Sequence, residues 1–140
     1  MKIIKTGDEF LAEMEARFGP PEDFHPTATY IPDGDCIEFI ARPGPYRAQR
    51  LDDLVTVYLS EADDEIVGSL IKGIQKLCRQ LTEKLPGFKV NVDDGRIRLE
   101  HLFLAYTWSE PLQSKLIQRT YRKLIEAAEA TKAEADLCVV

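Results

Sequence analysis

The sequence predicts an α+β fold in which helices pack on one face of an antiparallel sheet of about five strands. Three observations support this prediction. Short runs of β-branched and aromatic residues are bounded by turn residues, two longer segments carry apolar residues at helical spacing, and an Asp-Gly pair joins two alternating segments. We expect the order α-β-β-β-α-β-β-α, with a three-stranded meander and a separate hairpin.

Length and composition bound the organisation of the chain. Its 140 residues suffice for one ordinary domain, and 44% of them are hydrophobic, as in globular proteins. No internal repeat and no linker divides the sequence. We therefore expect a single domain, residues 1–140.

The first element is a predicted helix over residues 7–18. Thr6 and Glu9 have the spacing of a capping box, and apolar residues then recur at helical spacing. Gly19 and the two prolines that follow it end the helix.

Residues 19–34 contain four of the eight prolines and predict a long irregular connection, within which residues 27–31 can be extended. Two interpretations of this segment stay open. It either carries Phe24 and Tyr30 into the core or covers another part of the molecule.

Three strands are expected next. Residues 35–41 have β-type composition and end at a Pro-Gly-Pro turn over residues 42–45. Extended character resumes over residues 46–60, most clearly at 54–59, and returns at 66–70. Joined in sequence, these strands predict a meander.

The acidic segment Glu61–Glu65 holds four carboxylates within five positions. A calcium loop needs alternating oxygen ligands over about twelve residues, and this segment has no such alternation. Aspartates are common in turns because they hydrogen-bond the turn backbone. We therefore interpret the segment as a solvated hairpin turn, and Gly68 after it as a bulge or a close backbone approach.

A second helix is predicted from Ile71, ending at Pro86 and Gly87. The face of this helix opposite its apolar stripe carries Lys72, Lys76 and Arg79, which we expect to be solvated. The apolar stripe consists of Ile71, Ile74, Leu77, Cys78, Leu81 and Leu85.

Residues 88–92 and 96–100 flank Asp-Asp-Gly and predict a hairpin. The second arm continues as an apolar run to Trp108, which predicts a strand buried on both faces. Four aromatic residues of the predicted strands could line a pocket, although aromatic residues in strands are most often in the core. They are Tyr58, Phe103, Tyr106 and Trp108.

The last helix is predicted to begin at Ser109, as its N-cap, with Pro111 in the first turn. Residues 127–135 are rich in alanine and charge, and we expect a frayed or projecting end. The apolar tail Leu137–Val140 can add an edge strand or contact a partner. The apolar stripe consists of Leu112, Leu116, Ile117, Tyr121, Leu124, Ile125 and Ala128.

Three short motifs within residues 33–74 resemble a small bacterial β-meander family of unknown function. They are Gly34–Asp35, Leu51–Asp53 and Glu65–Gly68, which in that family mark a strand start, a second strand and an acidic turn leading into a third strand. This chain departs from the family by an insertion at Arg42–Tyr46 and by its C-terminal helices. The resemblance implies a meander and no particular activity.

Charge and composition exclude several classes of function. The net charge is −6 and the sequence pI is about 5.0, which argues against nucleic acid as a partner. No apolar run approaches the roughly 20 residues that span a bilayer, and the N-terminus lacks a signal-peptide core. We expect a cytoplasmic protein with no membrane partner.

No cofactor and no metal site is expected. The three cysteines, Cys36, Cys78 and Cys138, are odd in number and widely spaced. We therefore expect them to serve as small apolar side chains and not to form disulfides or bind zinc. No glycine-rich phosphate loop and no nucleophile elbow occurs. The sequence therefore indicates no catalytic residues.

Glu38, Arg50 and His101 are the candidate ligand-binding residues. His101 could act as a general base, or it could be a hydrogen-bonded structural residue. Glu38 is a buried carboxylate if its side of the strand faces the core, and it is solvated if Ile37 and Phe39 face the core; we favour the second arrangement.

Arg50 belongs to a group with Arg42 and Arg47 that could bind a carboxylate or phosphate through forked hydrogen bonds. The alternative, which we favour, is that these arginines form salt bridges with Asp52 and Asp53.

The function that these observations favour is a non-enzymatic protein-interaction or accessory module, with homodimerisation as the default form of pairing. Unpaired strand edges and the apolar tail are the features behind this hypothesis. The alternative is a small-molecule-binding protein or enzyme, with a pocket between the sheet and the Pro-rich segment 19–34 in which Glu38, Arg50 and His101 converge.

Overall fold

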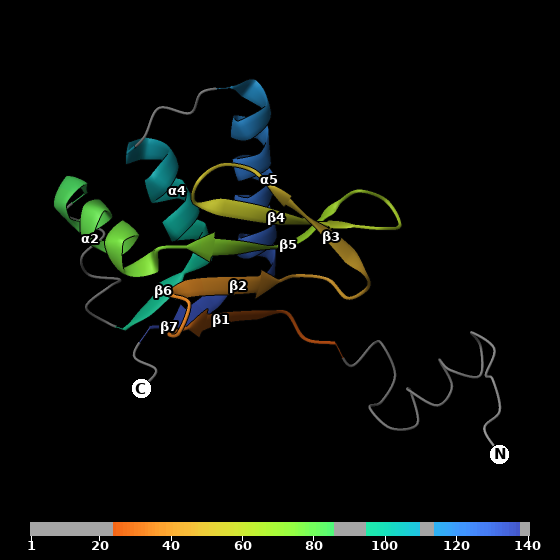
Figure 1. Cartoon of the computed structure of the whole chain (residues 1–140), viewed down its shortest axis with the longest axis horizontal. Coiled ribbons are helices and arrows are strands. Elements are labelled where there is room, and N and C mark those ends of the chain that lie inside the picture. Colours follow the sequence, from red (N-terminus) through yellow and green to blue (C-terminus); the bar gives the residue numbers. More distant parts are fainter. Residues whose placement is uncertain (1–23, 86–94, 110–113, 138–140) are drawn as a thin grey trace, which may run out of the picture.

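The computed structural model describes residues 24–85, 95–109 and 114–137 (Figure 1). The helix predicted for residues 7–18 and the first hairpin arm, residues 88–92, lie outside these ranges.

Five antiparallel strands form the main sheet, in the spatial order β1-β2-β5-β4-β3. The antiparallel α+β class is as predicted, and so is the extended piece at residues 27–31. The bounds are β1 Thr27–Ile31, β2 Cys36–Ile40, β3 Tyr46–Arg50, β4 Val55–Ser60 and β5 Ile66–Lys72.

Helices cover one side of this sheet. α4 and α5 lie behind it in Figure 1, and α2 continues from the end of β5. A short ribbon of two strands completes the described fold, and its strand β7 lies against β1. The bounds are α2 Ile74–Lys84, α4 Leu99–Ser109, α5 Lys115–Thr131, β6 Arg96–Arg98 and β7 Glu134–Asp136.

The meander has different members from those predicted. Residues 46–60 form two strands, so that β3, β4 and β5 are the three consecutive neighbours, whereas β2 pairs with β5. After β2, the N–H groups of Ala41 and Arg42 both donate to the carbonyl oxygen of Val67, at 2.7 and 3.3 Å. The chain therefore stays beside β5 until the prolines that follow, which lack N–H groups, lead it to the far edge.

The core lies between the sheet and the helices. Ile37 and Phe39 point from β2 toward the helices and are fully buried, which places Glu38 on the other side of the sheet, as we favoured. Tyr30 is also buried, as one interpretation of the Pro-rich segment predicted, but Phe24, which the same interpretation placed in the core, is only half-buried. The other fully buried large side chains are Val55, Ile71, Ile74, Leu81, Ile97, Leu99, Leu102, Phe103, Tyr121 and Leu124.

Helix α2 begins at Ile74, three residues later than predicted. Ile71 belongs to β5, and Gly73, with φ of 63°, changes the chain direction between strand and helix. The first N–H groups of the helix, which have no partner within it, donate to a residue that is far away in the sequence. The carbonyl oxygen of Asp35 accepts the N–H of Ile74 at 3.1 Å, and its carboxylate accepts the N–H of Gln75 at 3.1 Å.

The strand predicted beyond Glu100 is wrong, because residues 99–109 form helix α4. Leu99, Leu102 and Phe103 are buried at spacings of three and four, which is the helical pattern. Trp108, predicted to be in the core, is 71% exposed. A short apolar run in a sequence does not distinguish a buried strand from a buried helix, and here tertiary packing favours the helix.

The N-cap of helix α5 lies five residues after the predicted cap. Ser114 is the N-cap, and its Oγ accepts the N–H of Ile117 at 3.2 Å, whereas Ser109 ends α4. Leu116, predicted to be on the apolar stripe, is 69% exposed. The predicted frayed end at residues 127–135 is also wrong, because the helix runs to Thr131 and alanines both within it and after it are buried. They are Ala128 in the helix, and Ala133 and Ala135 after it.

Candidate functional site

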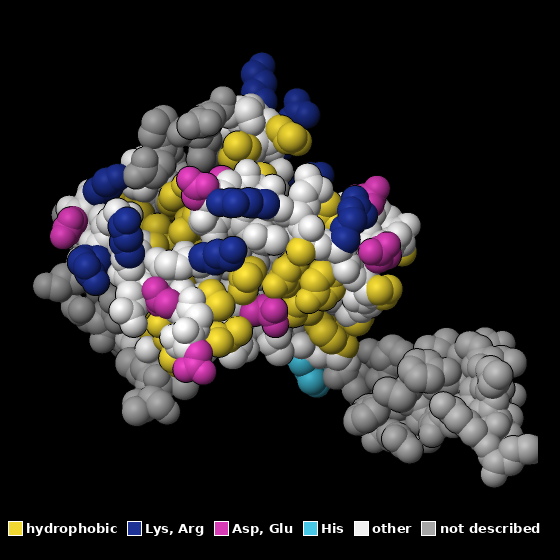
Figure 2. Space-filling view, viewed as in Figure 1, with side chains coloured by type: hydrophobic (Ala, Val, Ile, Leu, Met, Phe, Trp, Pro, Cys, Tyr) yellow, Lys and Arg dark blue, Asp and Glu magenta, His cyan; other side chains and the backbone are white. Residues whose placement is uncertain are grey.

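The side of the sheet opposite Ile37 and Phe39 is covered by no described helix; we call it the open face. Figure 2, seen from the same direction as Figure 1, shows this side, with hydrophobic side chains gathered over the end of β2 and the neighbouring strands. Antiparallel sheets often keep one solvated face. An uncovered face is therefore compatible with a stable monomer.

Glu38 lies on the open face, as predicted, but it is half-buried and not simply solvated. Its Oε2 accepts a hydrogen bond from the hydroxyl of Tyr58 at 3.0 Å. Burial, and then this hydrogen bond, raise the pKa of Tyr58. The ring of Tyr58 stacks on that of Tyr46, with centroids 4.3 Å apart, and Tyr46 is 41% exposed. Glu38 therefore anchors an aromatic stack that reaches the edge of the sheet.

Each of the three arginines has a nearby aspartate, but mostly not the predicted one. Arg50 pairs with Asp53 at 3.0 Å, as expected. Arg42 and Arg47 instead contact the two aspartates of the acidic turn. These contacts are Arg42–Asp63 at 3.1 Å and Arg47–Asp64 at 2.5 Å. The predicted anion-binding group is thus divided among exposed ion pairs.

His101 lies in helix α4, within the helical layer and not in a strand. The sheet separates this layer from Glu38, and Arg50 stands at the end of β3 (Figure 1). The structure does not bring the three predicted residues together. Within the described part of the chain, His101 Nδ1 and Ser69 Oγ are buried without a hydrogen-bond partner. A ligand-binding role for Glu38, Arg50 or His101 individually stays a prediction.

The acidic turn is solvated, as predicted, and connects β4 to β5. Among residues 24–85, 95–109 and 114–137, no group of three or more His, Cys, Asp or Glu side chains could hold a metal ion. Cys78 is buried, and burial raises the pKa of its thiol to about 11. A thiol in this state is a poor nucleophile near neutral pH.

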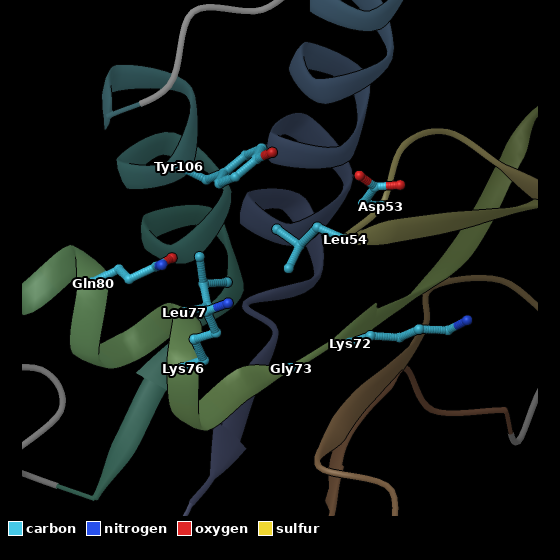
Figure 3. A pocket seen from close by; sticks show the side chains of 8 residues that line it. All are labelled: Asp53, Leu54, Lys72, Gly73, Lys76, Leu77, Gln80 and Tyr106. Carbon is cyan, nitrogen blue, oxygen red and sulfur yellow. The ribbon is translucent and has the colours of Figure 1, made fainter.

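A cavity of about 340 Å³ lies between α2, α4 and the turn that precedes β4 (Figure 3). Leu54, Leu77 and Tyr106 supply its apolar walls, and the Lys72 side chain points away from them. The remaining lining residues are Asp53, Gly73, Lys76 and Gln80. The volume and the mixed apolar and polar lining allow the cavity to hold a small molecule.

A second cavity, of about 190 Å³, lies between α5 and the strands β3 and β4, where Leu59 and Leu116 contribute apolar surface. Residues 24–34, the described part of the Pro-rich segment, line neither cavity. The pocket that the sequence placed against this segment is therefore not one of these two.

Strand β3 is one of the two outer strands of the main sheet, and all five of its residues are exposed. The hydrogen bonds at the two ends of β3 show which of its residues bond toward β4 and which point away from it. The N–H of Leu51 donates to the carbonyl oxygen of Val55 at 2.9 Å, and the N–H of Glu61 donates to that of Pro45 at 3.1 Å. Positions 45 and 51, just outside β3, are therefore bonded toward β4.

In an antiparallel ladder, residues that bond the neighbouring strand alternate with residues whose N–H and C=O groups point away from it. Since positions 45 and 51 bond toward β4, the backbone groups of Tyr46, Ala48 and Arg50 point away from the sheet. These groups form the exposed edge of β3. The sequence predicted extended structure here, but as one strand with β4, and it could not predict the edge position, because that depends on which strands become neighbours.

No helix in the described ranges is both long enough and apolar enough to cross a membrane. Comparisons with protein-family models, with curated proteins and with solved structures find no match to this chain, so the resemblance of residues 33–74 to a β-meander family stays a prediction.

Proposed function

We propose that this protein is a non-enzymatic interaction module that binds an extended segment of a protein partner along the exposed edge of β3. The observation that carries the proposal is the row of outward N–H and C=O groups at Tyr46, Ala48 and Arg50 on a fully exposed strand. A partner strand can pair with such a row and gain affinity from main-chain hydrogen bonds.

The other edge of the sheet is less suited to this role. β7 lies against β1, so part of that edge already has a neighbour within the chain. Among the described residues, β3 has a strand on one side only. Strand addition is therefore proposed at β3.

Natural proteins often protect edge strands with short length, charge and proline. β3 is five residues long, contains two arginines and follows Pro45. Both arginines, however, contact aspartates of the same chain, Arg47 with Asp64 and Arg50 with Asp53. Because these charges are already compensated, they repel an approaching strand less than free charges would.

The proposed partner is a protein rather than a nucleic acid, and the proposed location is the cytoplasm. The net charge of −6 supports the first point, because phosphate backbones are bound by basic surfaces. Cell fractionation tests the second point, and recovery of the protein outside the cytoplasm would contradict it.

A second candidate function is small-molecule binding in the cavity of Figure 3. Its volume, about 340 Å³, reaches the lower end of the range typical of ligand pockets, roughly 300–1,000 Å³. Native mass spectrometry of the purified protein tests it. An extra mass that is lost on denaturation supports a ligand, and the bare 15.9 kDa chain counts against one.

Ala48→Pro is the sharpest test of the edge. Proline removes the outward N–H of Ala48, which makes no bond to β4, so the sheet should keep its internal hydrogen bonds. Ala48→Lys changes the side chain at the same position, and Ala62→Lys, in the exposed turn after β4, is its matched control.

Each variant is used to capture binding proteins from an extract of the source cells. We expect partners that Ala48→Pro recovers about tenfold less well than wild type and Ala62→Lys recovers equally well. In the purified complex, amide hydrogen exchange at residues 46–50 should be slowed. Equal recovery by Ala48→Pro, with its fold confirmed by circular dichroism, rejects the edge as the binding site.

A further inference from the structure

We infer that the strand received by β3 is β3 of a second copy of this chain, paired antiparallel about a two-fold axis that passes through Ala48. This inference rests on the proposed function, because it names the partner of the same edge. It follows from the phase of the backbone groups and from the order of side chains along Tyr46–Arg50.

The phase of the outward groups allows a symmetric pairing. When the axis passes through Ala48, each Ala48 N–H meets the Ala48 carbonyl oxygen of the second copy. Tyr46 then lies opposite Arg50 of the second copy, and both positions also have outward backbone groups. The free groups of the strand are therefore satisfied by identical groups of the same strand, as an isologous interface requires.

The side chains of Tyr-Arg-Ala-Gln-Arg fit this register. On the open face, the guanidinium of Arg50 comes beside the ring of Tyr46 of the second copy, a cation–π arrangement. This contact would extend the Tyr46–Tyr58 stack across the interface. The smallest side chain, Ala48, lies on the same open face at the axis, and on the opposite face Arg47 lies opposite Gln49.

Moving the axis by one residue is unfavourable. With the axis at Arg47, the two Arg47 side chains would lie directly opposite each other, and like charges in that position are unfavourable even when each has an aspartate beside it. That axis would also face groups already bonded to β4 instead of the outward groups of Ala48. The Ala48 register is therefore distinguished both by the backbone and by the side chains.

Sedimentation velocity across protein concentrations up to about 1 mM measures the association. A five-residue strand pair is a small interface, so we expect reversible dimerisation that strengthens with concentration, toward twice the 15.9 kDa chain mass. Ala48→Pro and Ala48→Lys should raise the dissociation constant about tenfold or more, and Ala62→Lys should leave it unchanged.

Cysteine cross-linking tests the register separately. In a hydrogen-bonded antiparallel pair the Cα atoms are about 5.5 Å apart, within the range that a disulfide spans. After replacement of Cys36, Cys78 and Cys138 by alanine, Ala48→Cys should form a covalent dimer with copper–phenanthroline as oxidant. Gln49→Cys, whose copies would be two residues out of register, should not.

The outcomes separate this inference from the proposed function. A wild-type chain that stays monomeric at every concentration overturns the self-pairing. If the same chain still captures a partner that Ala48→Pro loses, the edge binds a different protein and the proposed function stands. A dimer that Ala48→Pro leaves intact, or that Gln49→Cys cross-links as well as Ala48→Cys, overturns the inferred interface.

Discussion

At the scale of single residues, Asp52 connects parts of the chain that lie far apart in sequence. Its Oδ1 accepts the N–H groups of Leu54 and Val55 at 2.9 and 2.8 Å, which fixes the turn between β3 and β4. Its Oδ2 accepts the hydroxyl hydrogen of Tyr121, in α5, at 2.5 Å. One carboxylate therefore fixes the turn that follows the proposed edge strand and ties it to the helical layer.

Removing the Tyr121 hydroxyl should destabilise the fold. Tyr121 is fully buried, and Tyr121→Phe leaves Asp52 Oδ2 without this donor. We expect the free energy of unfolding in urea to fall by about 1–2 kcal/mol, as for other hydrogen bonds to charged groups. Tyr46→Phe, which removes a hydroxyl from an exposed side chain, should change it by less than about 0.5 kcal/mol. Equal effects of the two changes would contradict the assigned role.

Cys78 should make stability depend on pH in the alkaline range. Burial, and then the nearby Asp35 charge, raise the pKa of its thiol from 9.0 to about 11 in the folded state. The folded protein therefore holds this proton more tightly than the unfolded chain. The resulting stabilisation is complete below pH 9 and is lost as the pH rises toward 11.

Urea unfolding between about pH 8 and pH 10 measures this effect under reducing conditions. Wild type should lose stability across this range, by an amount that reaches roughly 2 kcal/mol only near pH 11. Cys78→Ala should be less stable at the start but show a shallower decline. The less buried Cys36, whose thiol pKa is also raised by burial, is the comparison, and its change to alanine should flatten the decline less than Cys78→Ala does. A wild-type slope in Cys78→Ala would assign the effect to other groups.

The candidate residues show how far local sequence carries a functional prediction. The alternation of β2 placed Glu38 on the correct side of its strand, because side chains of a strand point to opposite faces in turn. The hydrogen bond between Glu38 and Tyr58 could not be predicted from this alternation, since β2 and β4 are brought close together only by β5, which lies between them. His101 was predicted to lie in a strand but lies in helix α4, so the neighbours predicted for its side chain were also wrong.

At the scale of elements, Gly68 fixes the geometry of the central strand. A Cβ atom at this position would lie 2.0 Å from the carbonyl oxygen of Phe39. The register between β4 and β5 also shifts beside it, between Tyr58 and Leu59. The sequence-based interpretation, a bulge or a close backbone approach, is confirmed on both counts.

Gly68→Ala should therefore be strongly destabilising. The new methyl group would meet backbone atoms of β2, which cannot move without disturbing the β2–β5 ladder. We expect a loss of at least about 2–3 kcal/mol, measured by thermal or urea unfolding. Gly34→Ala is the control, because its nearest neighbour is the Sγ of Cys36 at 3.3 Å, a side chain that can shift. A mild effect at Gly68 would mean that the ladder is more plastic than the structure indicates.

Element boundaries were predicted well where a local interaction sets them. The acidic turn after β4 is an example, because aspartate side chains bond their own turn, as Asp63 does with the N–H of Glu65 at 3.0 Å. Helix α2 shows the opposite case. Its first N–H groups are satisfied by Asp35, about forty residues earlier, so nothing local marked its start.

At the scale of the whole molecule, one core joins all the described layers. Side chains from the main sheet, the three helices and the β6–β7 ribbon belong to a single buried cluster. Tyr121 contributes to this cluster and also bonds Asp52 in the sheet layer. No layer can therefore lose its structure without exposing part of the same core.

We accordingly expect one cooperative unfolding transition, which also tests the single-domain prediction. Far-ultraviolet circular dichroism follows the helices, and near-ultraviolet circular dichroism follows the buried tyrosines. The two urea curves should coincide within error. Trp108, which is 71% exposed, is a poor probe of this transition. Two separated midpoints would show that the sheet and the helical layer unfold as distinct units.

The sequence by itself determined the α+β class, most strand and turn positions, the side of β2 that faces the core, and the need for glycine at position 68. These features depend on interactions between residues close in the chain, or on the fixed alternation of a strand. Tertiary structure decided that residues 99–109 are a helix and that β2 pairs with β5. It also decided that β3 is left at an edge. These outcomes depend on which apolar surfaces meet, and burial is a non-directional driving force that local sequence does not specify.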